Sequence, residues 1–168
     1  MAHRLLELVT RVIPLRRKRA SVVCVRDGQL LCVRLRDPVA QIARLFVPGG
    51  AVERGETPAQ AAQRETLEET GYRIRVIPDA LRVARYPFRW AGVDIDCTTH
   101  FFGGALVDAS DAPQPRSPNE PAYNEACVWI PLSEVDQALG YHPQILAAVR
   151  QVLDQVGAPS TVVPQDAR

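Results

Sequence analysis

The sequence lacks three features that would place it at once in a large class of proteins. It has no excess of charge, because 20 Lys and Arg residues oppose 19 Asp and Glu residues. General nucleic-acid-binding proteins usually carry a strong basic excess, so we expect no such partner. No apolar run approaches the roughly 20 residues of a membrane-spanning helix. We therefore expect a soluble protein with no membrane partner.

Cysteine pairs of the CxxC type are also missing. The four cysteines each lie in an apolar stretch and are Cys24, Cys32, Cys97 and Cys127. Cysteine in such surroundings behaves as a small hydrophobic residue. We predict buried free thiols in a reducing compartment, which favours a cytoplasmic location.

The length of 168 residues predicts a single domain with terminal extensions. Charged residues interrupt the apolar ones of the N-terminus and a basic cluster follows them, the reverse of an export signal. We predict an N-terminal helix and a solvated basic connector over residues 1–19, with the basic run at 16–19. The domain itself is expected over 20–156, and a disordered tail over 157–168.

Strand and turn signals alternate through the chain. Two β-rich runs flank Asp27-Gly28, a strong hairpin signal, so we predict a hairpin over 21–36. Further strands are predicted at 72–77, 80–86, 93–106 and 127–131, an exposed proline-rich loop at 111–121, and closing helices at 132–139 and 142–156. We expect Pro78-Asp79 and residues 89–92 to interrupt the strands.

One helix has clear boundaries. Thr57 is the expected N-cap, Pro58 occupies the first helical position, and Gln60 completes a capping box. Gly71 provides the stop. A helix is therefore predicted between Pro58 and Gly71.

Three glutamates lie on one face of this helix. At about 100° per residue, Glu65, Glu68 and Glu69 share an arc of about 100°. Their oxygens, with no Cys or His nearby in the sequence, suit Mg²⁺, with Mn²⁺ as a substitute. The alternative from these residues alone is an exposed acidic helix without a ligand.

The residues around these glutamates extend the pattern. The spacing of Gly50, Glu56, Arg64, Glu65, Glu68, Glu69 and Gly71, preceded by Val47-Pro48-Gly49, resembles the signature of the Nudix hydrolase family. Thr66 departs from the family pattern, which usually has a larger aliphatic residue there. Because Thr66 projects toward the expected sheet, this departure concerns packing rather than chemistry.

The resemblance extends over most of residues 20–155 and implies an α/β fold, an α/β/α sandwich around a mixed sheet. It implies metal-dependent hydrolysis of a pyrophosphate bond in a nucleoside diphosphate linked to another group. The implied metal ligands are Glu65, Glu68, Glu69 and the carbonyl of Gly49. A pair between Arg64 and Glu56, together with Gly50 and Gly71, would support this site.

The general base and the substrate contacts are less defined by sequence. The base is either a helix carboxylate or a loop acid, Glu120 or Glu125, and Glu125 better fits the family spacing before Trp129. Arg34 and Arg36 are candidate phosphate ligands, with ordinary surface arginines as the alternative. Four aromatic residues either stack against the nucleobase of the substrate or pack in the core. They are Phe46, Tyr86, Phe88 and Trp90. We assign Phe88 to the substrate and Phe46 to the core.

The expected partner is a nucleotide-type small molecule, and a homodimer is compatible with the sequence. Pro87, fifteen residues after Tyr72, resembles the ADP-ribose pyrophosphatase subgroup. Nucleoside triphosphates, dinucleoside polyphosphates and capped RNA are the alternative substrates. A binding or regulatory module of the same fold, without turnover, is the alternative function.

Overall fold

Two segments of the chain are described by the structure, a computed structural model: residues 14–107 and 121–157. The predicted N-terminal helix, most of the proline-rich loop with Glu120, and the tail from 158 lie outside the described residues. The elements in chain order are β1 (Leu15–Arg26), β2 (Gln29–Arg36), β3 (Ala43–Phe46), β4 (Gly49–Ala51), α1 (Pro58–Thr70), β5 (Ile74–Trp90), β6 (Val93–Leu106), β7 (Asn124–Pro131), a 3-10 turn (Leu132–Glu134), α2 (Val135–Leu139) and α3 (Pro143–Gly157).

The seven strands form a mixed sheet. Its main order is β3-β2-β1-β6-β5, while β4 pairs with β1 and β7 pairs with β2. Strands β1 and β6 run parallel, and the other pairs are antiparallel. The predicted α/β class with a mixed sheet is confirmed.

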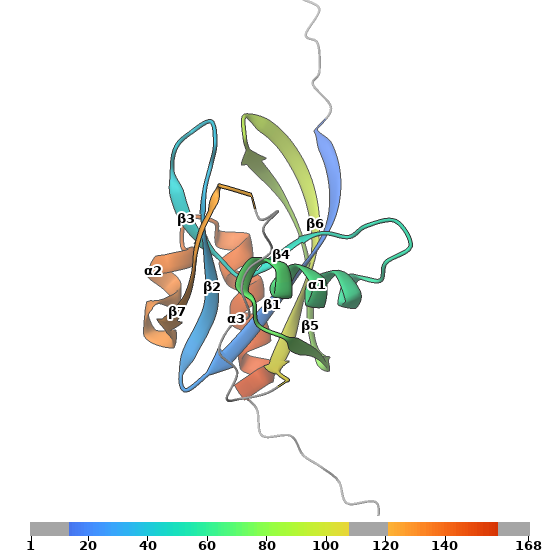
Figure 1. The fold of residues 1–168 in the computed structure, drawn as a ribbon, viewed down its shortest axis with the longest axis vertical. Helices are drawn as coiled ribbons and strands as arrows, with labels where there is room; N and C mark the ends of the chain where they lie inside the picture. The colour runs from blue at the N-terminus through green and yellow to red at the C-terminus, as the bar shows by residue number, and fades with distance from the viewer. Residues whose placement is uncertain (1–13, 108–120, 158–168) are drawn as a thin grey trace, which may run out of the picture.

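Helices cover both faces of the sheet (Figure 1). Helix α1 contributes Ala61 and Ala62 to one core, which also contains Val22 of β1. Helix α3 contributes Val149 to the opposite core, which contains Val23. Neighbouring residues of β1 thus enter different cores, because side chains alternate between the faces of a strand. None of the helices in the described part of the chain is long and apolar enough to span a membrane.

The predicted hairpin and the predicted helix are both confirmed. Strands β1 and β2 pair through Val25 with Leu30 and are joined by Asp27-Gly28, whose φ angles of 51° and 73° suit a tight turn. In helix α1 the Thr57 hydroxyl accepts the Gln60 N–H, and the Gln60 side chain accepts the Thr57 N–H. Gly71 ends the helix in a left-handed conformation.

Three cysteines are buried as predicted, and the fourth is half-buried. Cys24, Cys32 and Cys97 lie in the cores, while Cys127 on β7 is partly accessible. Burial raises the pKa of Cys24 to about 11 and that of Cys32 to about 12. Both thiols are therefore protonated at neutral pH.

The basic run at 16–19 is not a connector, and this prediction is wrong. Residues Arg16 to Arg19 lie in β1, where they pair in parallel with Asp96 to Thr99 of β6. No glycine or proline separates them from the apolar part of the strand. Hydrogen bonding to β6 therefore extends the strand back to Leu15, and the ordered sheet begins earlier than the predicted boundary at residue 20.

Strand β5 is one long strand, although we predicted two. Pro78-Asp79 does not end it; a register shift between Ile77 and Leu81 accommodates the extra residues. Proline is tolerated here because β5 is an edge strand, where a missing N–H can face away from the sheet. The predicted break at 89–92 narrows to Ala91-Gly92, with φ angles of 52° and 77°.

Smaller corrections concern the short elements. The predicted helix 132–139 begins as a 3-10 turn and becomes α2 at Val135. Strand β7 begins at Asn124 rather than at Cys127. The sequence does not predict the short strands β3 and β4. They form by pairing with β2 and β1, which lie elsewhere in the sequence.

Candidate active site

Two glycines bring strand β4 close to its neighbours. Gly49 has a φ of 153°, and a Cβ atom there would lie 2.2 Å from the carbonyl oxygen of Ala20. A Cβ atom on Gly50 would lie 2.3 Å from the carboxyl carbon of Glu65. A side chain at Gly49 would therefore displace β4 from β1, and one at Gly50 would displace the Glu65 carboxylate.

The three helix glutamates have unequal surroundings. Glu69 is 9% exposed, and its Oε2 accepts the Gly49 N–H at 2.9 Å. The Glu65 side chain is 17% exposed and packs against Gly50. The Glu68 side chain is 44% exposed. The side chains of the acidic face predicted from helical spacing thus differ in exposure, from the buried Glu69 to the exposed Glu68.

Arg64 connects these acids to the preceding loop. Its Nε and Nη2 atoms donate to the two oxygens of Glu56 at 2.8 and 3.0 Å. Its Nη1 donates to Glu65 Oε1 at 3.0 Å and to Glu68 Oε2 at 3.1 Å. The guanidinium also reaches the carbonyl of Ala51 at 3.1 Å. The expected pair of Arg64 and Glu56 is present, and Arg64 contacts two of the expected metal ligands as well.

The surroundings shift the pKa values of this network in opposite directions. The hydrogen bond from Arg64 lowers the pKa of the Glu56 carboxyl below its ordinary value. Burial raises the pKa of Glu65, and the bond from Arg64 opposes part of that rise. Glu56 therefore holds its negative charge more firmly than Glu65 does.

A hollow of about 250 Å³ lies over this network, and we call it the acidic hollow. Its lining residues come from six strands, helix α1 and the segment before β7, and are Arg17, Arg19, Leu35, Phe46, Gly49, Gly50, Ala51, Glu65, Glu69, Phe88, Trp90, Ile95 and Tyr123. Arg19 Nη2 donates to the carbonyl of Gly49 at 3.2 Å. The hollow thus combines two carboxylates with two guanidinium groups, a mixture that suits a phosphate substrate with a cation.

Sequence reasoning left Arg17 and Arg19 out of the site. They alternate with Arg16 and Lys18 along β1, so each pair faces one side of the sheet. The sequence does contain a signal for them. If the basic run continues the strand, every second residue of the run lies on one face, so Arg17 and Arg19 lie on the same side of the sheet.

The three remaining polar candidates meet one another instead of lining the acidic hollow. Glu125 Oε2 lies 3.3 Å from Arg34 Nε, and Glu125 Oε1 accepts from Arg36 Nε. Arg34 pairs with Ala126, whereas Leu35 pairs with Asn124, so Glu125 is the extra residue of a β-bulge. A bulge redirects a side chain and is common beside active sites. Here it gives Glu125 two arginine partners.

Asn124 joins this bulge to helix α1. Its Nδ2 donates to the carbonyl of Glu69 at 3.2 Å, and the residue is buried. The start of β7 is therefore fixed relative to the helix that carries the acidic face. No sequence motif singles out Asn124.

The donor set fits a hard divalent cation. Arginines contact three of the expected metal-donor oxygens. Arg19 donates to the carbonyl of Gly49, and Arg64 donates to the carboxylates of Glu65 and Glu68. As the side chains lie, no group of three His, Cys, Asp or Glu residues within 14–107 and 121–157 converges on one point. The oxygens present are those that Mg²⁺ prefers, and Gly49, Glu65, Glu68 and Glu69 could hold it with waters completing the shell.

Aromatic rings also line the acidic hollow. Phe46 contacts Phe88, Trp90 and Tyr141 edge to face at centroid distances of 6.0, 6.0 and 5.5 Å. Tyr86 is buried and its hydroxyl bonds to Thr99, so it serves the core. Phe46 of β3 and Phe88 and Trp90 of β5 all line the hollow. Phe46 is half-buried, so it is not confined to the core.

A protein-family model and known proteins match this chain. The model of the NUDIX domain matches residues 15–154. A MutT-like protein of Streptomyces ambofaciens is 42% identical over 57 residues, 34% of each chain. The ADP-sugar pyrophosphatase of Mus musculus is 32% identical over 125 residues, 74% of this chain and 52% of that protein. The chain thus spans about a third and about half of the length of these relatives.

Solved structures share the fold at low sequence identity. A NUDIX hydrolase from Nitrosomonas europaea superposes with a TM-score of 0.60 at 23% identity, covering 83% of this chain and 90% of that one. An Ap4A hydrolase of C. elegans gives 0.60 at 19% identity, covering 83% and 97%. With the family model matched from β1 through α3, the chain belongs to the Nudix hydrolase family.

Proposed function

We propose that the acidic hollow is the active site of a metal-dependent pyrophosphohydrolase. Its substrate is a nucleoside diphosphate linked to another group, and the bond cleaved is the P–O–P bridge. The observation that carries this proposal is the packing of Glu65 and Glu69 against the two glycines of β4. This packing places carboxylate and carbonyl oxygens together on the floor of a hollow that also contains arginines.

In this proposal Gly49, Glu65, Glu68 and Glu69 hold Mg²⁺, and Mn²⁺ can replace it. The bound cation supplies charge neutralisation to the phosphate oxygens and acidifies a water. Arg17 and Arg19 line the same hollow and add positive charge for the diphosphate. Arg64 keeps the loop of Glu56 in place and positions the helix acids.

The reaction is a displacement at phosphorus. A water oxygen forms the new P–O bond, the bridging P–O bond breaks, and a carboxylate accepts the proton of the water. Two residues compete as this base. One is a helix carboxylate, of which Glu65 lines the hollow. The other is Glu125, which lies on the bulge of β7 and is bound to Arg34 and Arg36.

An ADP-sugar is the substrate class that we favour. The mouse relative named ADP-sugar pyrophosphatase aligns over 74% of this chain. Pro87 lies in β5, where its carbonyl bonds to the ring of His142 at 3.1 Å, beside Phe88 of the hollow. Dinucleoside polyphosphates are the second choice, since they carry the same adenosine phosphate unit.

A phosphate-release assay tests the proposal. ADP-ribose, a nucleoside triphosphate and a dinucleoside tetraphosphate are each incubated with the protein and Mg²⁺ or Mn²⁺. A phosphatase releases phosphate from the monoesters formed from ADP-ribose and from the tetraphosphate, whereas inorganic pyrophosphatase alone releases it from the pyrophosphate formed from the triphosphate. We expect metal-dependent release that is fastest with ADP-ribose, abolished by a chelator. Release from no member of the panel with either metal would contradict the proposed activity and favour the non-catalytic module.

A further inference from the structure

A second hollow, of about 560 Å³, is lined mainly by basic residues, and we call it the basic hollow. Its lining residues belong to β1, β5 and β6 and are Arg16, Arg17, Lys18, Arg85, Asp96 and Thr98. Four of them are cationic and one is acidic. The proposed function gives no role to Arg16, Lys18 or Arg85, so this surplus of positive charge needs a separate explanation.

Strand pairing sets the residues of the basic hollow in rows. Lys18 of β1 and Arg85 of β5 both pair with Thr98 of β6, one from each side. Side chains of paired residues lie on the same face of a sheet, and neighbouring strands are about 4.8 Å apart. The Cα atoms of Lys18 and Arg85 are thus about 10 Å apart, with Thr98 between them. Arg16 pairs with Asp96 in the adjoining row. Backbone hydrogen bonds therefore fix the spacing of these residues.

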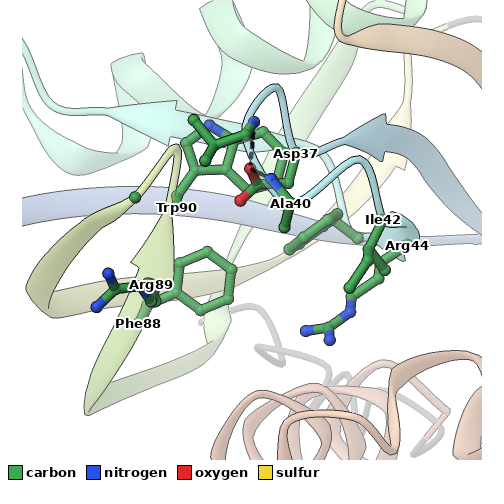
Figure 2. Close-up of a pocket in the computed structure, with 10 residues that line it drawn as sticks. Asp37, Ala40, Ile42, Arg44, Phe88, Arg89 and Trp90 are labelled. Carbon is green, nitrogen blue, oxygen red and sulfur yellow. Dashed lines mark hydrogen bonds between the residues drawn. The ribbon is translucent and has the colours of Figure 1, made fainter.

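The basic hollow and the acidic hollow lie on opposite faces of β5. Phe88, which lines the acidic hollow, and Arg89 point to opposite sides of their strand in Figure 2. Arg85 lies four residues before Arg89 in a stretch that pairs with β6 without a register shift, so it shares the side of Arg89. The two hollows meet at Arg17, which lines both. The basic hollow is therefore a separate site rather than an extension of the acidic one.

The cations of the basic hollow lack a partner of opposite charge. Arg89 pairs with Asp94, the residue opposite it on β6, at 2.7 Å. In the part of the chain that the structure describes, no such ion pair involves Arg16, Lys18 or Arg85. Like charges on one face of a sheet repel one another. A bound anion would relieve this repulsion.

The lining favours a compact phosphate anion over a long polyanion. None of its residues is aromatic, so it offers no ring for the stacking that single-stranded nucleic acids use. Asp96 would repel a phosphate chain that ran along the whole hollow. A guanidinium group binds phosphate through two hydrogen bonds, an ammonium group binds it as a point charge, and a hydroxyl group donates one more bond. Arg85, Lys18 and Thr98 supply these three groups.

We propose that the basic hollow is a second anion site, which binds a diphosphate group between Lys18 and Arg85. Two linked phosphates fit better than one, because the two cations approach from strands on either side of β6. The diphosphate is either free pyrophosphate or part of a nucleotide, since both present the same oxygens. The site does not depend on the proposed function, because it lies on the other face of the sheet from the acidic hollow.

Calorimetry with pyrophosphate tests the site. The titration omits divalent metal, because Glu65 and Glu69 of the acidic hollow repel pyrophosphate when no cation neutralises them. We expect one binding event, which Arg85→Gln and Lys18→Gln each weaken at least about fivefold. Arg89→Gln is the matched control, since it removes the same charge from the same strand but that charge already has a partner; affinity should stay within about twofold. No binding by the parent, or equal weakening by all three substitutions, would overturn the proposal.

An uncharged substitution tests whether the anion lies between the strands. Thr98→Val keeps the branched shape of the side chain and the charge of the protein but removes the hydroxyl group. We expect it to weaken pyrophosphate binding at least about threefold, through the loss of one hydrogen bond. An unchanged affinity would contradict a site centred on Thr98.

ADP distinguishes the two sources of the diphosphate. Binding of ADP that Arg85→Gln weakens as much as it weakens binding of pyrophosphate would support a site that also accepts nucleotides. Binding of ADP that Arg85→Gln leaves unchanged, beside weakened binding of pyrophosphate, would support a site for free pyrophosphate.

Hydrolysis separates this site from the proposed activity. Arg85→Gln should retain turnover of ADP-ribose within about twofold while it loses pyrophosphate binding, since Arg85 faces away from the acidic hollow. Loss of both together would place the pyrophosphate in the acidic hollow and overturn the second site. Pyrophosphate binding by a protein that hydrolyses no member of the substrate panel would refute the proposed activity alone.

Discussion

The N–H of Gly49 donates to Glu69 Oε2, so a carboxylate near the end of helix α1 fixes a strand that precedes the helix by several residues. Glu68, the next residue along the helix, has an exposed side chain. Two adjacent acids of the same signature thus have different structural roles. This difference allows the loss of activity and the loss of stability to be separated.

Glu68→Gln and Glu69→Gln should each lower turnover by at least about a hundredfold, because each removes a negatively charged oxygen expected to bind the metal. Glu68→Gln should change the free energy of unfolding by less than about 1 kcal/mol, since its ion pair with Arg64 is partly exposed. Glu69→Gln should also lower the free energy of unfolding by about 1–3 kcal/mol, through the weakened bond to Gly49. Hydrolysis at saturating Mg²⁺ and urea unfolding measure both effects. Turnover of Glu68→Gln within threefold of the parent would contradict the metal face.

Arg64→Ala and Glu56→Gln should be strongly coupled, because the two side chains form a two-point ion pair. A double-mutant cycle of urea unfolding should give a coupling free energy of about 1–3 kcal/mol. The matched control is Arg150→Ala with Asp136→Asn, because both side chains of that ion pair are exposed. Its coupling free energy should be less than about 1 kcal/mol. Strict additivity at Arg64 and Glu56 would show that the pair contributes nothing to stability.

Acid should remove the contribution of Glu56. Its pKa in the folded protein is lowered from the ordinary value of 4.5, chiefly by the bond from Arg64. A lowered folded pKa means stability that is present above the unfolded pKa and is lost as the pH falls through the folded pKa. The parent should therefore exceed Glu56→Gln in stability at pH 7, and the difference should shrink progressively below about pH 4.5. Unfolding curves at pH 7, 5, 4 and 3 measure it; a difference that stays constant over this range would contradict the prediction.

Glu125→Gln should lower turnover more than Glu120→Gln, and more at neutral than at alkaline pH. If Glu125 accepts the proton of the attacking water, its loss matters least where hydroxide is plentiful. On the bulge of β7 it is held by Arg34 and Arg36, one residue after Asn124, which bonds to helix α1. Profiles of turnover against pH for both variants distinguish the two candidate bases. Equal, small and pH-independent losses would assign the base to the helix glutamates.

Local sequence determined the helix and the hairpin. The capping box of Thr57 and Gln60, the left-handed Gly71 and the turn at Asp27-Gly28 each depend on residues within four positions of one another. The acidic face follows in the same way, because a helix places residues three and four apart on one side. Such features can be predicted from a single sequence, since the interactions that stabilise them close within one or two turns of the chain.

Only the tertiary structure decided the surroundings of that face. Arg19 reaches Gly49 across thirty positions, Asp37 reaches Ala91 across fifty-four, and Arg36 reaches Glu125 across eighty-nine. These contacts depend on which strands pair and in which register, so a shift of one residue would turn each side chain to the other face of the sheet. The sequence by itself therefore determined which acids and glycines form the centre of the site. Long-range strand pairing decided which arginines and aromatic rings surround it.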